Sequence, residues 1–215
     1  MRLSLSLILA SAILEFLVSP SSVLAQTTLA DLRAQIDIDS QELDEIDTLL
    51  SDVDPNRRAA AINLLIKSGN PAFVERAIEV GLLSDDPRMR AVSLQKVLET
   101  GGPFTLDIQL TDAEEENTSI RKWLSDYGKG SWNESDGVGT TVFAIDDFDQ
   151  KNNCWPFLNV KKCALVVDGE RVMLAGWQYA VGALTLQDDG TLEGTFGYSY
   201  GDQSAPLPAS IRLIE

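Results

Sequence analysis

The stretch "DPNRRAAAINLL", residues 54–65, opens with Asp-Pro and continues with apolar residues at helical spacing. The same order of residues returns in "NPAFVERAIEVGLL", residues 70–83, and in "DPRMRAVSLQKVL", residues 86–98. Asp and Asn cap helix N-termini by accepting backbone N–H bonds, and Pro suits the first helical position because no N–H is needed there. Together the three stretches predict three helices of about three turns, which short connections force to pack antiparallel.

The first and third of these helices also match each other, with a period of 32 residues from Pro55 to Pro87. The matching positions are Pro55, Arg58, Ala59, Ile62 and Leu65 in the first helix and Pro87, Arg90, Ala91, Leu94 and Val97 in the third. The D-P-x-x-R-x-A start over residues 54–101 resembles a HEAT-type helical repeat. The resemblance implies a stacked helical scaffold, often a protein-binding one, and implies no enzyme activity.

One and a half repeats cannot bury their own apolar faces, so another segment must cover them. Residues 29–50 are the candidate, because Leu29, Leu32, Ile36, Leu43, Ile46 and Leu50 follow a 3–4 spacing. The pattern favours an amphipathic cap over a coiled-coil dimer seam, since Asp39 interrupts the seam and could itself cap a second helix. A partner is expected on the side left open by the absent repeat. The candidate contacts on the last helix are Arg88, Arg90, Leu94 and Leu98.

The N-terminus has the features of a secretory signal. Arg2 precedes the apolar run 3–14, and small residues at Val23 and Ala25 predict cleavage after Ala25. A membrane anchor is the alternative, which Glu15 argues against by interrupting the apolar run. We therefore predict a periplasmic or secreted protein with no membrane span after cleavage, divided into a signal peptide (1–25), a helical segment (26–101) and a β domain (102–215).

Charge and composition restrict the function. The chain carries a net charge of −16 and no His. Such an acidic protein repels the phosphates of nucleic acids and anionic lipid surfaces. Without imidazole the chain lacks the Ser-His-Asp and Cys-His systems and the HExxH zinc site. The two cysteines, Cys154 and Cys163, predict a disulfide in an exported protein, and a reactive thiol is the less favoured alternative.

After Gly101-Gly102 the apolar period changes from helical to alternating. Residues 104–110 alternate strictly, and two hairpins are predicted to turn at Asp168-Gly169 and at residues 188–190. With residues 139–145 and 209–214, at least six strands are expected. The fold class is therefore α+β with segregated parts: a short helical stack and then an antiparallel β-sandwich or small β-barrel. We expect the break at Gly101-Gly102 to separate two cores.

Three features of the β half suggest binding sites. Asp146, Asp147 and Asp149 lie close together in sequence, but the loop departs from the EF-hand template, so an acidic loop is favoured over a Ca²⁺ site and no cofactor is predicted. Trp155, Trp177 and Tyr179 could stack on a sugar, and Trp155 is the best surface candidate because it lies inside the predicted disulfide loop. Carboxylate pairs are abundant, but no particular pair stands out as the acid and base of a glycosidase.

These observations favour an exported, non-enzymatic scaffold that binds a protein partner through its helical segment. A β module binding a small ligand, such as a glycan or a lipid, is the alternative, and a carboxylate-based hydrolase ranks third. An uncovered apolar groove on the helices would favour the first function. A groove lined by Trp155 and tyrosines would favour the second, and two carboxylates facing each other across a cleft would favour the third.

Overall fold

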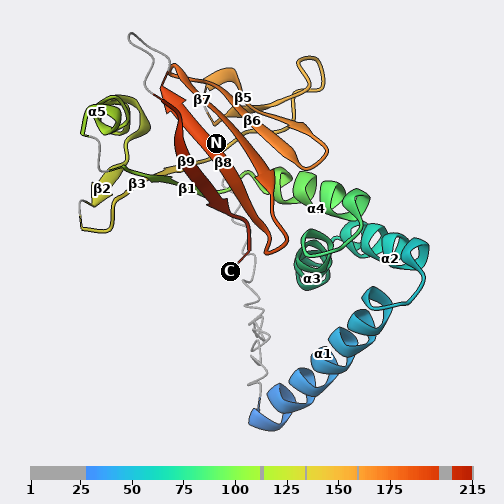
Figure 1. Ribbon diagram of the computed structural model, residues 1–215. Helices are drawn as coiled ribbons and strands as arrows, with labels where there is room; N and C mark the ends of the chain where they lie inside the picture. The colour runs from blue at the N-terminus through green and yellow to red at the C-terminus, as the bar shows by residue number, and fades with distance from the viewer. Residues whose placement is uncertain (1–27, 112–113, 134, 159, 199–204, 215) are drawn as a thin grey trace, which may run out of the picture. The chain divides into compact units, whose positions relative to one another are not determined.

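The computed structural model describes residues 28–111, 114–133, 135–158, 160–198 and 205–214 (Figure 1). The predicted signal segment, residues 1–25, lies outside the described residues. Four helices precede the sheet: α1 (Leu29–Leu50), α2 (Pro55–Ser68), α3 (Pro71–Leu82) and α4 (Pro87–Glu99). The chain divides into two compact units between Gln41 and Glu42, inside α1. All contacts between helices and sheet that are described below lie within the second unit.

The predicted starts of α2, α3 and α4 are confirmed by their caps. The side chains of Asp54, Asn70 and Asp86 each accept the backbone N–H of the residue two positions on, and proline follows each cap. These bonds satisfy N–H groups that have no partner inside the helix. The sequence therefore fixes where each of these helices begins. The likeness to a HEAT-type repeat stays a prediction.

Helix α1 runs without interruption through Asp39, so the predicted second cap at this residue is wrong. The Asp39 carboxylate instead accepts a hydrogen bond from Gln35 Nε2 (2.7 Å), one helical turn back. The predicted capping role is confirmed at the C-terminal end of α1. There Ile46 and Leu50 are buried in one apolar cluster with residues of α2, α3 and α4, namely Ile62, Ala77 and Met89.

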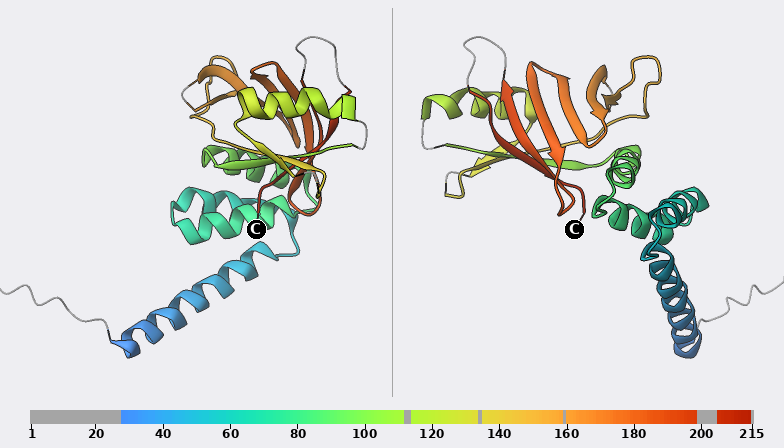
Figure 2. Two further views of the ribbon diagram at one scale, coloured as in Figure 1. Left: turned by 90° about the vertical axis from the view of Figure 1, so that its left-hand side faces the viewer. Right: turned by 45° about the vertical axis from the view of Figure 1, so that its right-hand side comes forward.

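The described part of the chain forms one nine-stranded antiparallel sheet in the order β2-β3-β1-β9-β8-β7-β6-β5-β4. The sheet curls into a half-barrel rather than a closed sandwich (Figures 1 and 2). The α+β class is therefore confirmed, together with both predicted hairpins, although the first turns at residues 169–170, one residue later than predicted. The strands are β1 (Phe104–Gln109), β2 (Ser131–Asn133), β3 (Val138–Phe143), β4 (Trp155–Phe157), β5 (Val160–Asp168), β6 (Arg171–Trp177), β7 (Ala180–Leu186), β8 (Thr191–Tyr198) and β9 (Leu207–Arg212).

Helix α5 (Glu114–Trp123) and the π-helical turn η1 (Leu124–Gly128) follow β1. Figure 2 shows α5 lying across one face of the sheet. Trp123 anchors it there: the indole ring is fully buried, with its centroid 4.8 Å from Trp177 and 4.8 Å from Phe196. Its Nε1 donates to the Trp177 carbonyl (3.3 Å). Two aromatic side chains of the sheet, Trp177 and Phe196, thus hold α5 through Trp123.

The apolar core does not divide at Gly101-Gly102 as we expected. Five residues of α3 and α4 belong to the same buried cluster as the sheet: Ile78, Leu82, Leu94, Val97 and Leu98. The sheet therefore covers the side of α4 that the absent repeat was expected to leave open. The cluster crosses the predicted boundary between segments 26–101 and 102–215, and that division itself stays a prediction.

Candidate functional site

The predicted partner surface on α4 is largely buried. Leu94 is 0% exposed and Leu98 is 2% exposed, because both pack into the core of the sheet. Neither side chain is therefore accessible for the contact with a partner that we expected. Arg88 is exposed and pairs with Asp86, the cap of its own helix. Only Arg88 of the four predicted residues has a side chain that another molecule could reach freely.

Arg90 joins α4 to two hairpins of the sheet. Its NH2 group donates to the Leu186 carbonyl (2.6 Å), and its NH1 group donates to Asp188 Oδ1 (2.7 Å). Its Nε lies 2.8 Å from Glu170 Oε1, close enough for an ion pair but not aligned as a hydrogen bond. The side chain is only 8% exposed. Arg90 is thus engaged inside the protein, and its guanidinium group is not exposed as a contact for a partner would require.

The aromatic candidates have different environments. Trp155 is 4% exposed and packs against Phe148 with ring centroids 4.5 Å apart, so its predicted surface position is wrong. Trp177 is a core residue that contacts Trp123 and the ring of Phe157. Tyr179 is the exception, because half of its surface is exposed.

Tyr179 lies in the turn between β6 and β7, where the backbone is unusual. Gln178 and Tyr179 both have positive φ, 45° and 69°, although neither is glycine. Side chains other than glycine, asparagine and aspartate rarely adopt this conformation, and such strain often marks functional positions. The rings of Tyr179 and Tyr127 lie 6.5 and 6.3 Å from Tyr198, which places three tyrosines together beside η1.

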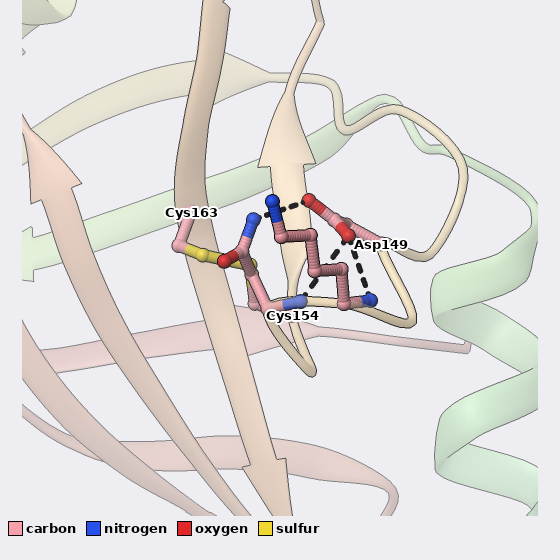
Figure 3. The surroundings of a disulfide bond; sticks show 5 residues. Asp149, Cys154 and Cys163 are labelled. Atoms are coloured by element: carbon pink, nitrogen blue, oxygen red, sulfur yellow. Dashed lines mark hydrogen bonds between the residues drawn. A yellow bond between two sulfur atoms is a disulfide. The ribbon is translucent and has the colours of Figure 1, made fainter.

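The acidic loop is organised by its own side chains (Figure 3). The Asp149 carboxylate accepts the backbone N–H groups of Lys151 and Asn152 and the Asn152 amide (2.6 Å). The hydrogen bonds from Asn152 and Lys151 lower the pKa of Asp149. Within the described residues, no three His, Cys, Asp or Glu side chains come together in a metal-binding group. Asp149 thus shapes the loop, and the structure does not bring it together with Asp146 and Asp147 as a ligand set.

The predicted disulfide is confirmed. Cys154 and Cys163 are joined, with their Cα atoms 5.6 Å apart, and no described cysteine is free. The bond lies next to the acidic loop, since the backbone of Cys154 exchanges hydrogen bonds with Asp149 (2.8 and 3.3 Å). The cross-link therefore fixes the end of this loop to strand β5.

An uncovered apolar surface of the helical segment lies on α1. Its exposed large apolar side chains include Leu29 (64%), Leu32 (50%), Ile36 (61%) and Leu43 (38%). These four residues, which we call the α1 stripe, continue the 3–4 spacing of the buried Ile46 and Leu50. With 22 residues, α1 is about 33 Å long, whereas α2, with 14 residues, is about 21 Å long. Helix α1 is therefore longer than α2, and the four residues of the stripe are not part of the buried cluster that contains Ile46 and Leu50.

Helix α1 begins with a capping box that sequence analysis missed. The Thr28 Oγ accepts the N–H of Asp31 (3.2 Å), while the Asp31 carboxylate accepts the N–H (2.9 Å) and the hydroxyl (2.7 Å) of Thr28. These bonds from Thr28 lower the pKa of Asp31. The signal was present in the sequence as Thr followed by an acid three residues later. The helix is strongly acidic, with seven acids and one base, Arg33.

A groove of about 920 Å³ opens between α3, the end of α4, β1 and the end of β9. Its apolar lining includes Val74, Ile78, Phe104 and Ile214. The polar lining carries three carboxylates and one base, and these residues are Glu75, Glu79, Asp107 and Arg212. The groove is a second uncovered apolar surface on the helical segment, within the second unit.

Comparisons with family models, with curated proteins and with solved structures found no match to this chain. Among the described residues, no helix has the length and apolar character needed to cross a membrane.

Proposed function

We propose that this chain is an exported, non-enzymatic scaffold that binds a protein partner through its helical segment, with the α1 stripe as the binding surface. The observation that carries the proposal is the exposure of four large apolar side chains at 3–4 spacing on one helix. Single exposed leucines are ordinary on protein surfaces, but an ordered stripe is typical of a helix that docks against another element.

The stripe is large enough to support a specific contact. Fully burying a Leu or Ile side chain contributes roughly 1.5–3 kcal/mol, and the four residues of the stripe are between 38% and 64% exposed. Covering the remaining surface would give roughly 3–6 kcal/mol in total, before the entropy lost on association. A partner must add polar contacts or further apolar surface to reach a stable complex.

The disulfide supports export. Cross-links of this kind form and persist in oxidising compartments such as the periplasm and the extracellular space. Together with the predicted signal segment, the bond favours a periplasmic or secreted location.

Site-specific photo-cross-linking tests the proposal. A photoreactive residue at Ile36, inside the stripe, should yield one defined adduct with a protein of the exported fraction. The same residue at Ala34, which lies on the other side of the helix, should yield none. Ile36→Glu should abolish the adduct formed from position Leu32, whereas Ala34→Glu should leave it unchanged. Equal adducts from positions 34 and 36, or none from either, would refute the role of the α1 stripe.

A small-ligand or glycan site on the β domain is the second candidate. The group Tyr127, Tyr179 and Tyr198, next to the strained turn and the π-helical turn η1, favours it. π-helical turns are rare and are frequent at functional sites. If this function is right, a glycan should raise the melting temperature of the wild type, and Tyr179→Ala should remove that rise without changing the melting temperature in the absence of glycan.

A further inference from the structure

The α1 stripe contains one charged residue at a position where a helix pair needs an apolar one. The 3–4 spacing that passes through Leu29, Leu32, Ile36 and Leu43 reaches Asp39 between the last two. Asp39 is exposed and accepts one hydrogen bond, from Gln35 Nε2. A partner helix that covers the stripe would therefore cover Asp39 as well, and a buried carboxylate is costly unless it is paired.

The rest of the helix is acidic too. Between Leu29 and Leu50 the seven acids and the single Arg33 give a net charge of −6. One of these acids, Asp47, is paired: Arg76 Nε donates to its Oδ1 at 2.7 Å. Arg76 also pairs with Glu79 of its own helix (2.7 Å), so it does not neutralise Asp47 fully. The surface around the stripe thus attracts positive charge.

A second copy of this chain is a poor occupant of the stripe. In a parallel, in-register pair, Asp39 would face Asp39 inside the seam, and like charges in such a position destabilise the pair. In an antiparallel pair, two helices with a net charge of −6 each would still repel one another. Anionic membranes are disfavoured for the same reason, because surface-binding amphipathic helices usually carry Lys and Arg on their polar face.

We infer that the α1 stripe binds a basic amphipathic helix of another protein, which pairs with α1 as a two-stranded coiled coil and places a Lys or Arg opposite Asp39. This inference rests on the proposed function and adds the chemistry of the partner. The stripe from Leu29 to Leu43 is about 21 Å long, which corresponds to two heptads of the partner. Asp39 sets the register of the pair, as a single polar core residue does in coiled coils.

Synthetic helices of three heptads provide the probes for a binding test with the full-length mature protein. The basic probe has Leu at its core positions, Lys at the flanking positions and one Lys at the core position opposite Asp39. In the acidic probe, Glu replaces the flanking Lys. In the apolar-core probe, Leu replaces the core Lys. Fluorescence anisotropy gives the Kd of each probe for the wild type and for the variants Ile36→Glu and Asp39→Leu.

The basic probe should bind the wild type at least about tenfold more tightly than the acidic probe does, and high salt should reduce the difference. Ile36→Glu should abolish binding. Asp39→Leu should reverse the preference between the basic and the apolar-core probes, because the core Lys then loses its partner. Equal binding of the acidic and basic probes, or an unchanged preference in Asp39→Leu, would overturn the inference.

The other occupants are tested with the same variants. Sedimentation of the wild type should show a monomer, and a dimer that Ile36→Glu dissolves would overturn the inference in favour of a second copy. Vesicles of zwitterionic or anionic lipid should not bind, and lipid binding lost in Ile36→Glu would overturn it as well. If photo-cross-linking from Ile36 identifies a partner that has no basic helix at the contact, the inference fails while the proposed function stands. If no position-dependent adduct forms, the proposed function itself fails.

Discussion

Arg90→Met tests whether α4 is joined to the sheet by the contacts seen in the structure. The substitution keeps an unbranched stem of similar size and removes the guanidinium group. The Leu186 carbonyl then loses a charged donor at 2.6 Å, and a hydrogen bond to a charged group contributes about 1.5–3 kcal/mol. Glu170, 28% exposed, loses its ion pair, which adds about 1 kcal/mol after discounting for its access to water. Asp188 is fully exposed, so the loss of its pair adds little.

The free energy of unfolding should therefore fall by about 3 kcal/mol, which corresponds to a decrease in Tm of about 6–12 °C for a chain of this size. Urea unfolding, followed by tryptophan fluorescence, measures the change. Arg88→Met is the matched control two positions away on the same helix. Its side chain is 73% exposed and pairs with Asp86, so losing this exposed pair should lower the free energy of unfolding by less than about 1 kcal/mol.

A loss below about 1 kcal/mol in Arg90→Met, or equal losses in the two variants, would refute the reasoning. Fluorescence reports on the sheet, because Trp123, Trp155 and Trp177 are buried there. Circular dichroism reports mainly on the helices. The two transitions should coincide in the wild type, because α3 and α4 share a core with the sheet.

Three further predictions concern single sites. Cys154→Ser should lower the free energy of unfolding by about 2–3 kcal/mol, as expected for opening a short loop. A reductant should lower the free energy of unfolding of the wild type to the same value. A wild type whose stability does not change with reductant would contradict this prediction. Hydrogen bonds from Arg88 lower the pKa of Asp86 to about 2 from 3.8, so its contribution to stability is present above pH 3.8 and lost as the pH falls toward 2. Urea midpoints measured across this range should fall less steeply in Asp86→Asn, and equal slopes would contradict the assignment. Gly81→Ala would place a Cβ 1.9 Å from Ser93 Oγ and should destabilise the protein by about 1–3 kcal/mol. Adding Ser93→Ala should recover part of this loss, because it removes the hydroxyl that the new Cβ meets. If the losses of the two substitutions simply add in the double variant, the clash is not the cause.

The sequence predicted those features of the fold that depend on neighbouring residues. Asp54, Asn70 and Asp86 cap their helices because the acceptor and the N–H groups are two positions apart. The alternation of residues 104–110 predicted β1, since every second side chain faces the core. The hairpins followed from Asp-Gly at 168–169 and from the glycine at position 190.

Features that depend on distant residues could not be predicted in this way. Arg90 contacts a carbonyl 96 positions away, and the sequence does not show that two hairpin turns lie beside α4. Trp155 appeared exposed because it lies in a short cross-linked loop, but the loop folds so that Phe148 covers the indole ring. Half-barrel and sandwich likewise share the same alternation of apolar residues, so only the pairing of strands distinguishes them.

The candidate site was partly visible in the sequence. The 3–4 spacing of α1 was recognised, and its assignment as a cap accounts for Ile46 and Leu50 only. The spacing alone does not show that the other four residues are exposed, and the extent of α1 was known only once the helix was seen to continue through Asp39. Asp39 interrupts the apolar spacing, and this argued against a seam between two copies of the chain. The same residue now indicates a basic partner.

The two sides of the helical stack in the second unit are both covered by elements of the same chain. The end of α1 buries one side, with Ile46 and Leu50, and the sheet buries the other, against Leu94 and Leu98. A partner that extended the stack as a further repeat would have to displace one of these covers, which would expose a fully buried core. A partner that adds a helix along the α1 stripe displaces nothing and buries side chains that are 38–64% exposed. Under the proposed function, the two covered sides of the stack therefore favour lateral pairing with α1 over extension of the stack.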